Sequence, residues 1–148
     1  MINQNLHLHG VLTLIHQQAD GTIQQQHYDN LIMSAGYDFI ADSLGNVANR
    51  PDVMNYIALG TGIEDTTPEQ TTLSAELDRN PASYQHTPGQ VSFSFSAQFP
   101  AGDATGAITE AGVFNASKGG IMFDRVTFPV VNKGKDDTLT TVFTFTMS

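Results

Sequence analysis

The sequence has 148 residues, with 15 acidic and six basic side chains and a formal net charge of −9. An acidic chain lacks the excess of Lys and Arg that binding to a phosphate backbone requires, so nucleic acid is excluded as an expected partner. There is no Cys, and neither a secretion signal nor a run of 18 apolar residues is present, which excludes disulfides and gives no reason to expect a membrane partner. At this length we expect a single domain over residues 1–148.

The N-terminal part of the sequence predicts a β-hairpin. Leu residues at positions 6, 8, 12 and 14 share one parity, as on one face of a strand. Asp20-Gly21 then supplies a turn before a second strand at 22–28. Residues 6–28 are therefore expected to form two antiparallel strands.

The middle of the sequence predicts a helix and two long loops. Apolar residues at helical spacing indicate a helix over 35–44, with Ser34 as its N-cap and Gly45 as the residue after its end. A weaker helical pattern covers 72–77. The polar stretches around it, 64–70 and 80–90, are expected to be adaptable loops.

Alternating apolar and hydroxyl residues predict further strands. Residues 91–99 alternate Val, Phe or Ala with Ser or Gln, and residues 138–147 repeat the pattern with Thr. Additional strands are expected at 56–59, 108–114 and 121–128. The fold class is therefore all-β, an antiparallel β-sandwich or jelly-roll-like barrel with one short helix.

Motifs for metal or phosphate binding are weak. His7 and His9 could share an ion with His27 on the paired strand, but no carboxylate completes the set, so a solvated surface is the preferred interpretation. Gly60-Thr61-Gly62 follows a strand without the Lys-Ser/Thr of a phosphate loop and indicates a tight turn. No cofactor and no metal are expected.

No catalytic pattern is visible, so the chain is not expected to be an enzyme. There is no Gly-x-Ser-x-Gly elbow, and no two of the carboxylates can be placed across a cleft. Arg79 and Glu110 are a candidate structural ion pair, because each lies at the edge of a segment of apolar or small residues. The alternative is that each is separately solvated.

Several stretches in order resemble structural proteins of tailed-bacteriophage virions. They are Asn30–Asp42, Tyr56–Gly62, Thr72–Arg79, Phe99–Gly102, Gly106–Asn115 and Phe128–Gly134, followed by the Thr-rich end of the chain. The resemblance covers about residues 6–147. It implies a β-sandwich or jelly-roll-like module that assembles in symmetric copies, with no catalytic residues.

This resemblance predicts a virion subunit, made in the host cytoplasm, that binds the major capsid protein or other virion proteins. A capsid decoration or cement role is preferred, with a tail, neck, baseplate or fibre-anchoring subunit as the alternative and a carbohydrate-binding module as a remote one. The expected contacts are in polar segments with little patterning. Their candidate residues are Met1, Asn3, Glu64, Thr67, Pro68, Pro81, Tyr84 and His86.

Overall fold

A computed structural model describes residues 4–148 as nine strands and one helix. The elements are β1 (Leu8–Gln17), β2 (Ile23–Ile32), α1 (Ser34–Gly45), β3 (Tyr56–Gly60), β4 (Glu76–Pro81), β5 (Ser83–His86), β6 (Ser92–Phe99), β7 (Gly106–Phe114), β8 (Met122–Lys133) and β9 (Thr138–Met147). The predicted all-β class with one short helix is confirmed.

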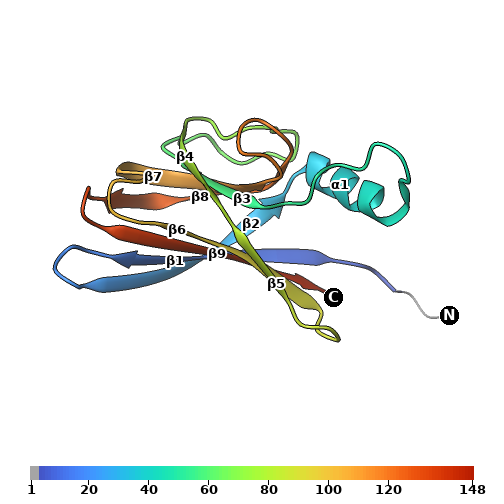
Figure 1. Cartoon of the computed structure of the whole chain (residues 1–148), viewed down its shortest axis with the longest axis horizontal. Helices are drawn as coiled ribbons and strands as arrows, with labels where there is room; N and C mark the ends of the chain where they lie inside the picture. The colour runs from blue at the N-terminus through green and yellow to red at the C-terminus, as the bar shows by residue number, and fades with distance from the viewer. Residues whose placement is uncertain (1–3) are drawn as a thin grey trace.

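The strands form one antiparallel sheet that curls into a nearly closed barrel (Figure 1). Their order is β4-β3-β7-β8-β2-β1-β9-β6-β5, so β4 and β5 are the two edges. The edge strands β4 and β5 follow each other in the chain. Ala82, the residue between them, donates its amide to the Asn55 carbonyl at 2.8 Å. The segment 76–86 therefore runs from one edge of the sheet to the other.

The sheet bends at a corner formed by strand β2. From Ile23 to Asn30 it pairs with β1, and only its last two residues pair with β8. Gly10 of β1 lies opposite Asn30, and a Cβ at Gly10 would lie 2.3 Å from the Asn30 side-chain oxygen. A side chain at position 10 would therefore displace the Asn30 side chain, which bonds to Asp124 at this corner.

The core fills the barrel with side chains from alternate positions of the strands. Phe143 and Phe145 of β9 are fully buried, and Phe145 meets Phe123 of β8 edge to face at 5.2 Å. Burying a Phe side chain contributes roughly 1.5–3 kcal/mol. The predicted alternation is confirmed for 92–99 and 138–147 by β6 and β9, whereas Val91 lies before β6 and is exposed.

The helix is confirmed, but its predicted caps are wrong. Met33 precedes the helix and makes no side-chain cap, while Ser34 is already helical. Gly45 is the last helical residue, and Asn46 follows in extended conformation. Packing sets the start instead, because the Met33 amide donates to the Phe123 carbonyl at 3.0 Å and so ties the helix to β8.

Two predictions for the segment 72–90 are wrong. Residues 72–75 are irregular instead of helical, and 76–81 form β4 beside β3. The expected loop 80–90 contains the end of β4 and all of β5. These strands are polar and lie at the sheet edges, where neither face is fully buried, so their sequence carries no alternation to detect.

Candidate functional site

The outer side of β5, β6, β9 and β1 forms a surface without formal charge. These four strands are neighbours in the sheet, and none contains Asp, Glu, Lys or Arg. Register places Ser94, Thr144 and Val11 in one row and Ser96, Val142 and Thr13 in the next. We call this surface the neutral face; its residues are Val11, Thr13, Ile15, Ser83, Gln85, Ser92, Ser94, Ser96, Gln98, Thr138, Thr140, Val142, Thr144 and Thr146.

The neutral face contrasts with the charge of the whole chain. A chain with net charge −9 keeps its 15 carboxylates outside these four strands. Short hydroxyl and β-branched side chains lose little rotamer freedom in a contact and need not be stripped of a tightly held hydration shell. Because charged residues are depleted in the cores of protein interfaces, this composition suits contact with another protein.

Two of the histidines considered for a metal site, His9 and His27, lie near one margin of the neutral face and have separate partners. His9 Nε2 lies 3.2 Å from Asp29 Oδ1, and His27 Nδ1 lies 2.9 Å from the Thr13 hydroxyl. Within residues 4–148, no group of three or more His, Cys, Asp or Glu side chains is gathered as metal ligands. His9 and His27 are therefore part of the polar margin of a protein surface.

A buried ion pair lies between strands β7 and β8. Arg125 donates to Glu110 Oε1 from Nε at 3.1 Å and from Nη2 at 3.0 Å, and both side chains are fully buried. Burial opposes ionisation of Glu110, but donors from the Ala75, Ser74 and Gly62 amides and Arg125 outweigh it and hold the pKa of Glu110 below its usual value. The carboxylate is therefore charged and fully hydrogen-bonded.

The Gly60-Thr61-Gly62 turn packs against this carboxylate. The Gly62 amide donates to Glu110 Oε2 at 2.8 Å. A Cβ would lie 2.5 Å from Glu110 Oε2 if built on Gly60 and 2.4 Å from it if built on Gly62. The tight turn predicted from the sequence encloses a carboxylate of the same chain, which is why both positions lack a side chain.

The segment 61–75, which we call the strap, is fixed by Arg125. The guanidinium donates to the Glu64 carbonyl and to the side chains of Thr66, Gln70 and Ser74, at 2.9–3.1 Å. Leu73 of the strap is buried beside Phe114 and Met122. Residues 64–70 form a loop, as predicted, but these bonds anchor its backbone to the barrel wall.

The predicted contact residues of the strap are exposed on this anchored backbone. Glu64, Thr67 and Pro68 all have exposed side chains. The Pro68 carbonyl accepts a bond from the Ser34 amide at 2.8 Å, which ties the strap to the first residue of α1. These side chains can meet a partner, but only as part of a preformed surface.

The predicted pair of Arg79 with Glu110 does not form. Arg79 Nη2 lies 2.6 Å from Glu76 Oε1, and its guanidinium carbon lies 3.8 Å from the centroid of the Phe114 ring. Arg79 also donates to the carbonyls of Ala116 and Gly119. β3 separates β4 from β7, so Glu110 meets Arg125 on its neighbouring strand instead.

The other predicted contact residues are on the edge strands or outside the described part. Pro81 ends β4, while Tyr84 and His86 belong to β5, and all three are exposed. The Tyr84 ring packs 5.2 Å from that of Phe95. Met1 and Asn3 lie outside the described residues, so the structure does not place them.

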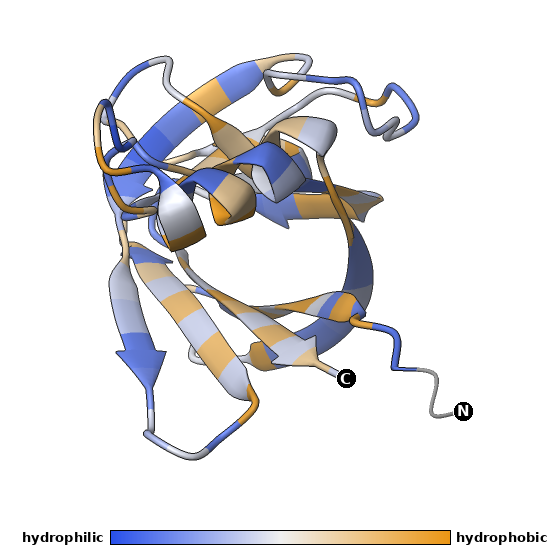
Figure 2. Cartoon of the chain, turned by 90° about the vertical axis from the view of Figure 1, so that its right-hand side faces the viewer, coloured by the Kyte–Doolittle hydropathy of each residue, from blue (hydrophilic) through white to orange (hydrophobic). Residues whose placement is uncertain are grey.

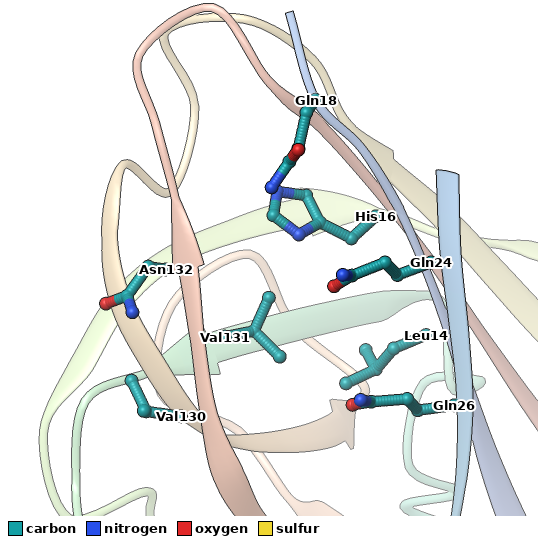
Figure 3. A pocket seen from close by; sticks show the side chains of 8 residues that line it. All are labelled: Leu14, His16, Gln18, Gln24, Gln26, Val130, Val131 and Asn132. Atoms are coloured by element: carbon teal, nitrogen blue, oxygen red, sulfur yellow. The ribbon is translucent and has the colours of Figure 1, made fainter. Parts of the chain in front are cut away.

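A polar slot opens in the barrel wall where β2 and β8 diverge (Figure 3). Its volume is about 190 Å³, and Gln24, Gln26 and Asn132 line it together with His16. His16 Nε2 lies 2.9 Å from Asp137 Oδ2, and this bond is the main reason that the pKa of Asp137 lies below its usual value. The pairing with Asp137 ties the end of β1 to the turn before β9.

A larger apolar cavity lies at the end of the barrel that carries α1. Figure 2 views the molecule from this end. The cavity has a volume of about 520 Å³. We call it the barrel mouth; it is lined by Phe39, Ile40, Ser43, Leu44, Arg50, Val53, Met54, Tyr84, Phe93, Phe95 and Phe123.

Two features of these surfaces were not identified from the sequence. Asp124 and Arg125 stand together between the apolar residues Ile121–Phe123 and Val126, which is a signal for buried charge. The barrel mouth combines residues far apart in the chain and has no local signal.

A comparison with family models, curated proteins and solved structures finds no match to this chain. Within residues 4–148, no helix has the length and hydropathy needed to cross a membrane.

Proposed function

We propose that this chain is a non-enzymatic structural subunit of a tailed-bacteriophage virion, and specifically a capsid decoration or cement protein. The neutral face is the observation that carries the proposal. It offers four adjacent uncharged strands on a chain of net charge −9. The resemblance of the sequence to phage structural proteins supports the same role.

The mechanism is adhesion by many weak contacts. Each copy presents the same rigid surface, and symmetry repeats the contact on the particle, so avidity replaces a single tight site. The major capsid protein is the proposed partner. Cementing neighbouring shell subunits requires a surface that keeps its shape, which the anchored strap and the nearly closed sheet supply.

Copy number tests where the subunit acts. Quantitative mass spectrometry of purified particles would measure the ratio of this chain to the major shell protein. We expect a ratio near one copy per shell subunit. A few copies per particle would favour the tail, neck, baseplate or fibre-anchoring alternative, and absence from particles would overturn the virion proposal.

A charge placed on the neutral face tests the surface itself. Thr144→Lys puts an ammonium in the centre of the face, where a partner would have to desolvate it. Thr105→Lys, at an exposed position of the loop before β7, is the matched control. We expect Thr144→Lys to reduce incorporation into particles at least tenfold and Thr105→Lys to leave it unchanged, with both variants folded by circular dichroism. Equal incorporation of the two would contradict the assignment of this face.

A further inference from the structure

We propose that strand β5 is a two-fold interface, at which β5 of a second copy pairs in antiparallel orientation and joins two barrels into one continuous sheet. Among the described strands, β5 pairs with β6 alone and so forms an edge of the sheet. In Figure 2 it is the arrow at the lower left, with β6 on one side of it and no ribbon on the other. The inference goes beyond the proposed function, because it concerns contact between copies of this chain and not contact with a shell protein.

The residue before β5 shows which backbone groups face the open side of this edge. The Ala82 amide donates to the Asn55 carbonyl at 2.8 Å, so it points away from β6. In an antiparallel strand, the N–H and C=O groups of successive residues point to alternate sides. Tyr84 and His86 therefore point the same way as Ala82, whereas Gln85 between them faces β6.

The pairing of β6 with β9 leads to the same assignment. The Met147 amide donates to the Val91 carbonyl at 2.9 Å, so Val91 and every second residue after it in β6 bond to β9. Ser94 is thereby left to bond to β5, where Gln85 lies opposite it. Two independent contacts thus agree on which side of β5 is open.

A second copy of β5 complements the groups on the open side. Within residues 4–148, the outward N–H and C=O groups of Tyr84 and His86 have no hydrogen-bond partner. In a two-fold pair centred on Gln85, Tyr84 of each copy lies opposite His86 of the other, and these two residues exchange both backbone bonds. All four free groups of each edge are then bonded. A pair centred on Tyr84 would place His86 opposite Ala82, whose amide is already bonded to Asn55.

The β5 edge lacks the features that keep sheet edges apart. Charged side chains and Pro are the usual protection of an exposed edge. The other edge strand, β4, has such residues: Glu76, Asp78, Arg79 and Pro81. By contrast, residues 82–99 contain no Asp, Glu, Lys or Arg, and β5 itself contains no Pro. The edge therefore brings no carboxylate into a contact between two chains of net charge −9, which favours a second copy as its partner.

The side chains of β5 are placed to allow this contact. The Tyr84 ring is 59% exposed although it packs against Phe95. Side chains directly opposite each other in an antiparallel pair are close enough to touch, so His86 of the second copy would cover part of this ring. Ser83 and Gln85 belong to the neutral face, which stays open because the new bonds lie in the plane of the sheet. The neutral faces of the two copies would then lie side by side.

A single introduced cysteine tests the register. The chain has no Cys, so a disulfide in a single-Cys variant must join two copies. Gln85→Cys places the two sulfurs at a pair of opposite residues without mutual backbone bonds, where Cα atoms are about 4.5 Å apart and a disulfide can form. Ser83→Cys, on the same face of β5, is the matched control, because Ser83 would lie opposite Thr87 of the second copy. After mild oxidation, we expect at least tenfold more covalent dimer from Gln85→Cys than from Ser83→Cys.

Sedimentation tests the association without a cross-link. Because an interface of one added strand is small, we expect a weak dimer that appears between about 10 μM and 1 mM. His86→Glu gives the edge a carboxylate like those of β4, and should weaken the dimer at least tenfold. Thr105→Glu adds the same charge at an exposed loop position and should leave the association unchanged. Circular dichroism checks that both variants are folded.

Three results would overturn the proposal. They are a wild type that stays monomeric throughout this range, equal cross-linking of the two Cys variants, and a dimer that His86→Glu does not weaken. The first of these would leave the edge to a strand of a different protein. A monomeric chain that is abundant in particles would refute this inference alone. A chain that dimerises through β5 but is absent from particles would refute the virion role alone.

Discussion

Glu110 and Arg125 make two hydrogen bonds with each other, at 3.1 and 3.0 Å, with neither side chain exposed to solvent. The remaining bonds of both residues go mainly to the strap, so the pair connects two strands of the barrel to a segment that includes the loop predicted at 64–70. Ion pairs in this setting are stable because every donor and acceptor is satisfied.

Removing the cation from this pair should strongly destabilise the fold. Arg125→Met leaves the Glu110 carboxylate buried without its counter-ion, and we expect a loss of about 3–5 kcal/mol in the free energy of unfolding. The double variant Glu110→Gln/Arg125→Met buries no charge and should lose less. Lys118→Met, at an exposed position, is the control and should stay within about 0.5 kcal/mol of the wild type. Urea denaturation measures all three, and a double variant less stable than Arg125→Met would contradict the role of uncompensated charge.

A methyl group in the turn at the end of β3 should disturb the carboxylate that the turn encloses. Gly62→Ala places a Cβ about 2.4 Å from Glu110 Oε2 and 2.5 Å from the Ser74 Cβ, so carboxylate and strap must both move. We expect a loss of roughly 1–3 kcal/mol. Gly45→Ala meets no atom within 4 Å at the end of α1 and should be neutral or slightly stabilising. Similar thermal midpoints for the two variants would show that the close approach is unimportant.

Truncating the apolar anchor of the strap should release it from the wall. Leu73 is 5% exposed and packs with Met33 and Phe114, so Leu73→Ala should lower stability by about 2–5 kcal/mol. Leu77→Ala, where the side chain is 45% exposed, should lower it by less. Hydrogen exchange at the amides of Gly62, Ser74 and Ala75, which bond to Glu110, should quicken in Leu73→Ala. Unchanged exchange there would mean that the hydrogen bonds of Arg125 and Glu110 hold the strap without the packing of Leu73.

Sequence patterns predicted the elements in which one face is buried. Residues 92–99 and 138–147 alternate cleanly because each strand has the Phe-rich core on one side and a partly exposed face on the other. The hairpin of β1 and β2 followed from its turn at Asp20-Gly21. Where both faces are partly exposed, as in β4, the period of two is lost and the strand was missed.

The partner of Glu110 could not be predicted, because it depends on register. Glu110 lies opposite Thr127, and Arg125 lies opposite Gly112, so the two charges are diagonal neighbours on one face. A shift in the strand register between Ile108 and Glu110 sets this alignment, and no sequence pattern predicts that shift. The barrel mouth could not be predicted either, because its walls come from segments that are far apart in the chain. These are α1, β5, β6, β8 and the segment before β3.

Asp124 should make stability depend on pH in the neutral range. Its carboxyl group is fully buried on β8, where it accepts bonds from the Val113 amide at 3.0 Å and from the Asn30 side chain, with no cation among these partners. Burial raises the pKa of Asp124 from 3.8 to about 7, although both hydrogen bonds act against the rise. The folded chain therefore holds this proton at pH values where the unfolded chain has lost it.

The sign of the effect follows from the raised pKa. The stabilising contribution is complete below about pH 4, decreases as pH rises, and is lost once the pH passes about 7. Asp124→Asn keeps the shape and removes the titration, so the variant should gain about 2–3 kcal/mol relative to the wild type between pH 5 and pH 7.5. The pKa values of Glu110 and Asp137 are lowered, so these groups change the stability only in more acidic solution. Their effect is the same in both proteins and cancels in the difference between them. Urea unfolding of both proteins at pH 5, 6, 7 and 7.5 measures it. A difference that stays constant across this range would mean that Asp124 is ionised in the folded chain, and that its two hydrogen-bond donors outweigh the effect of burial.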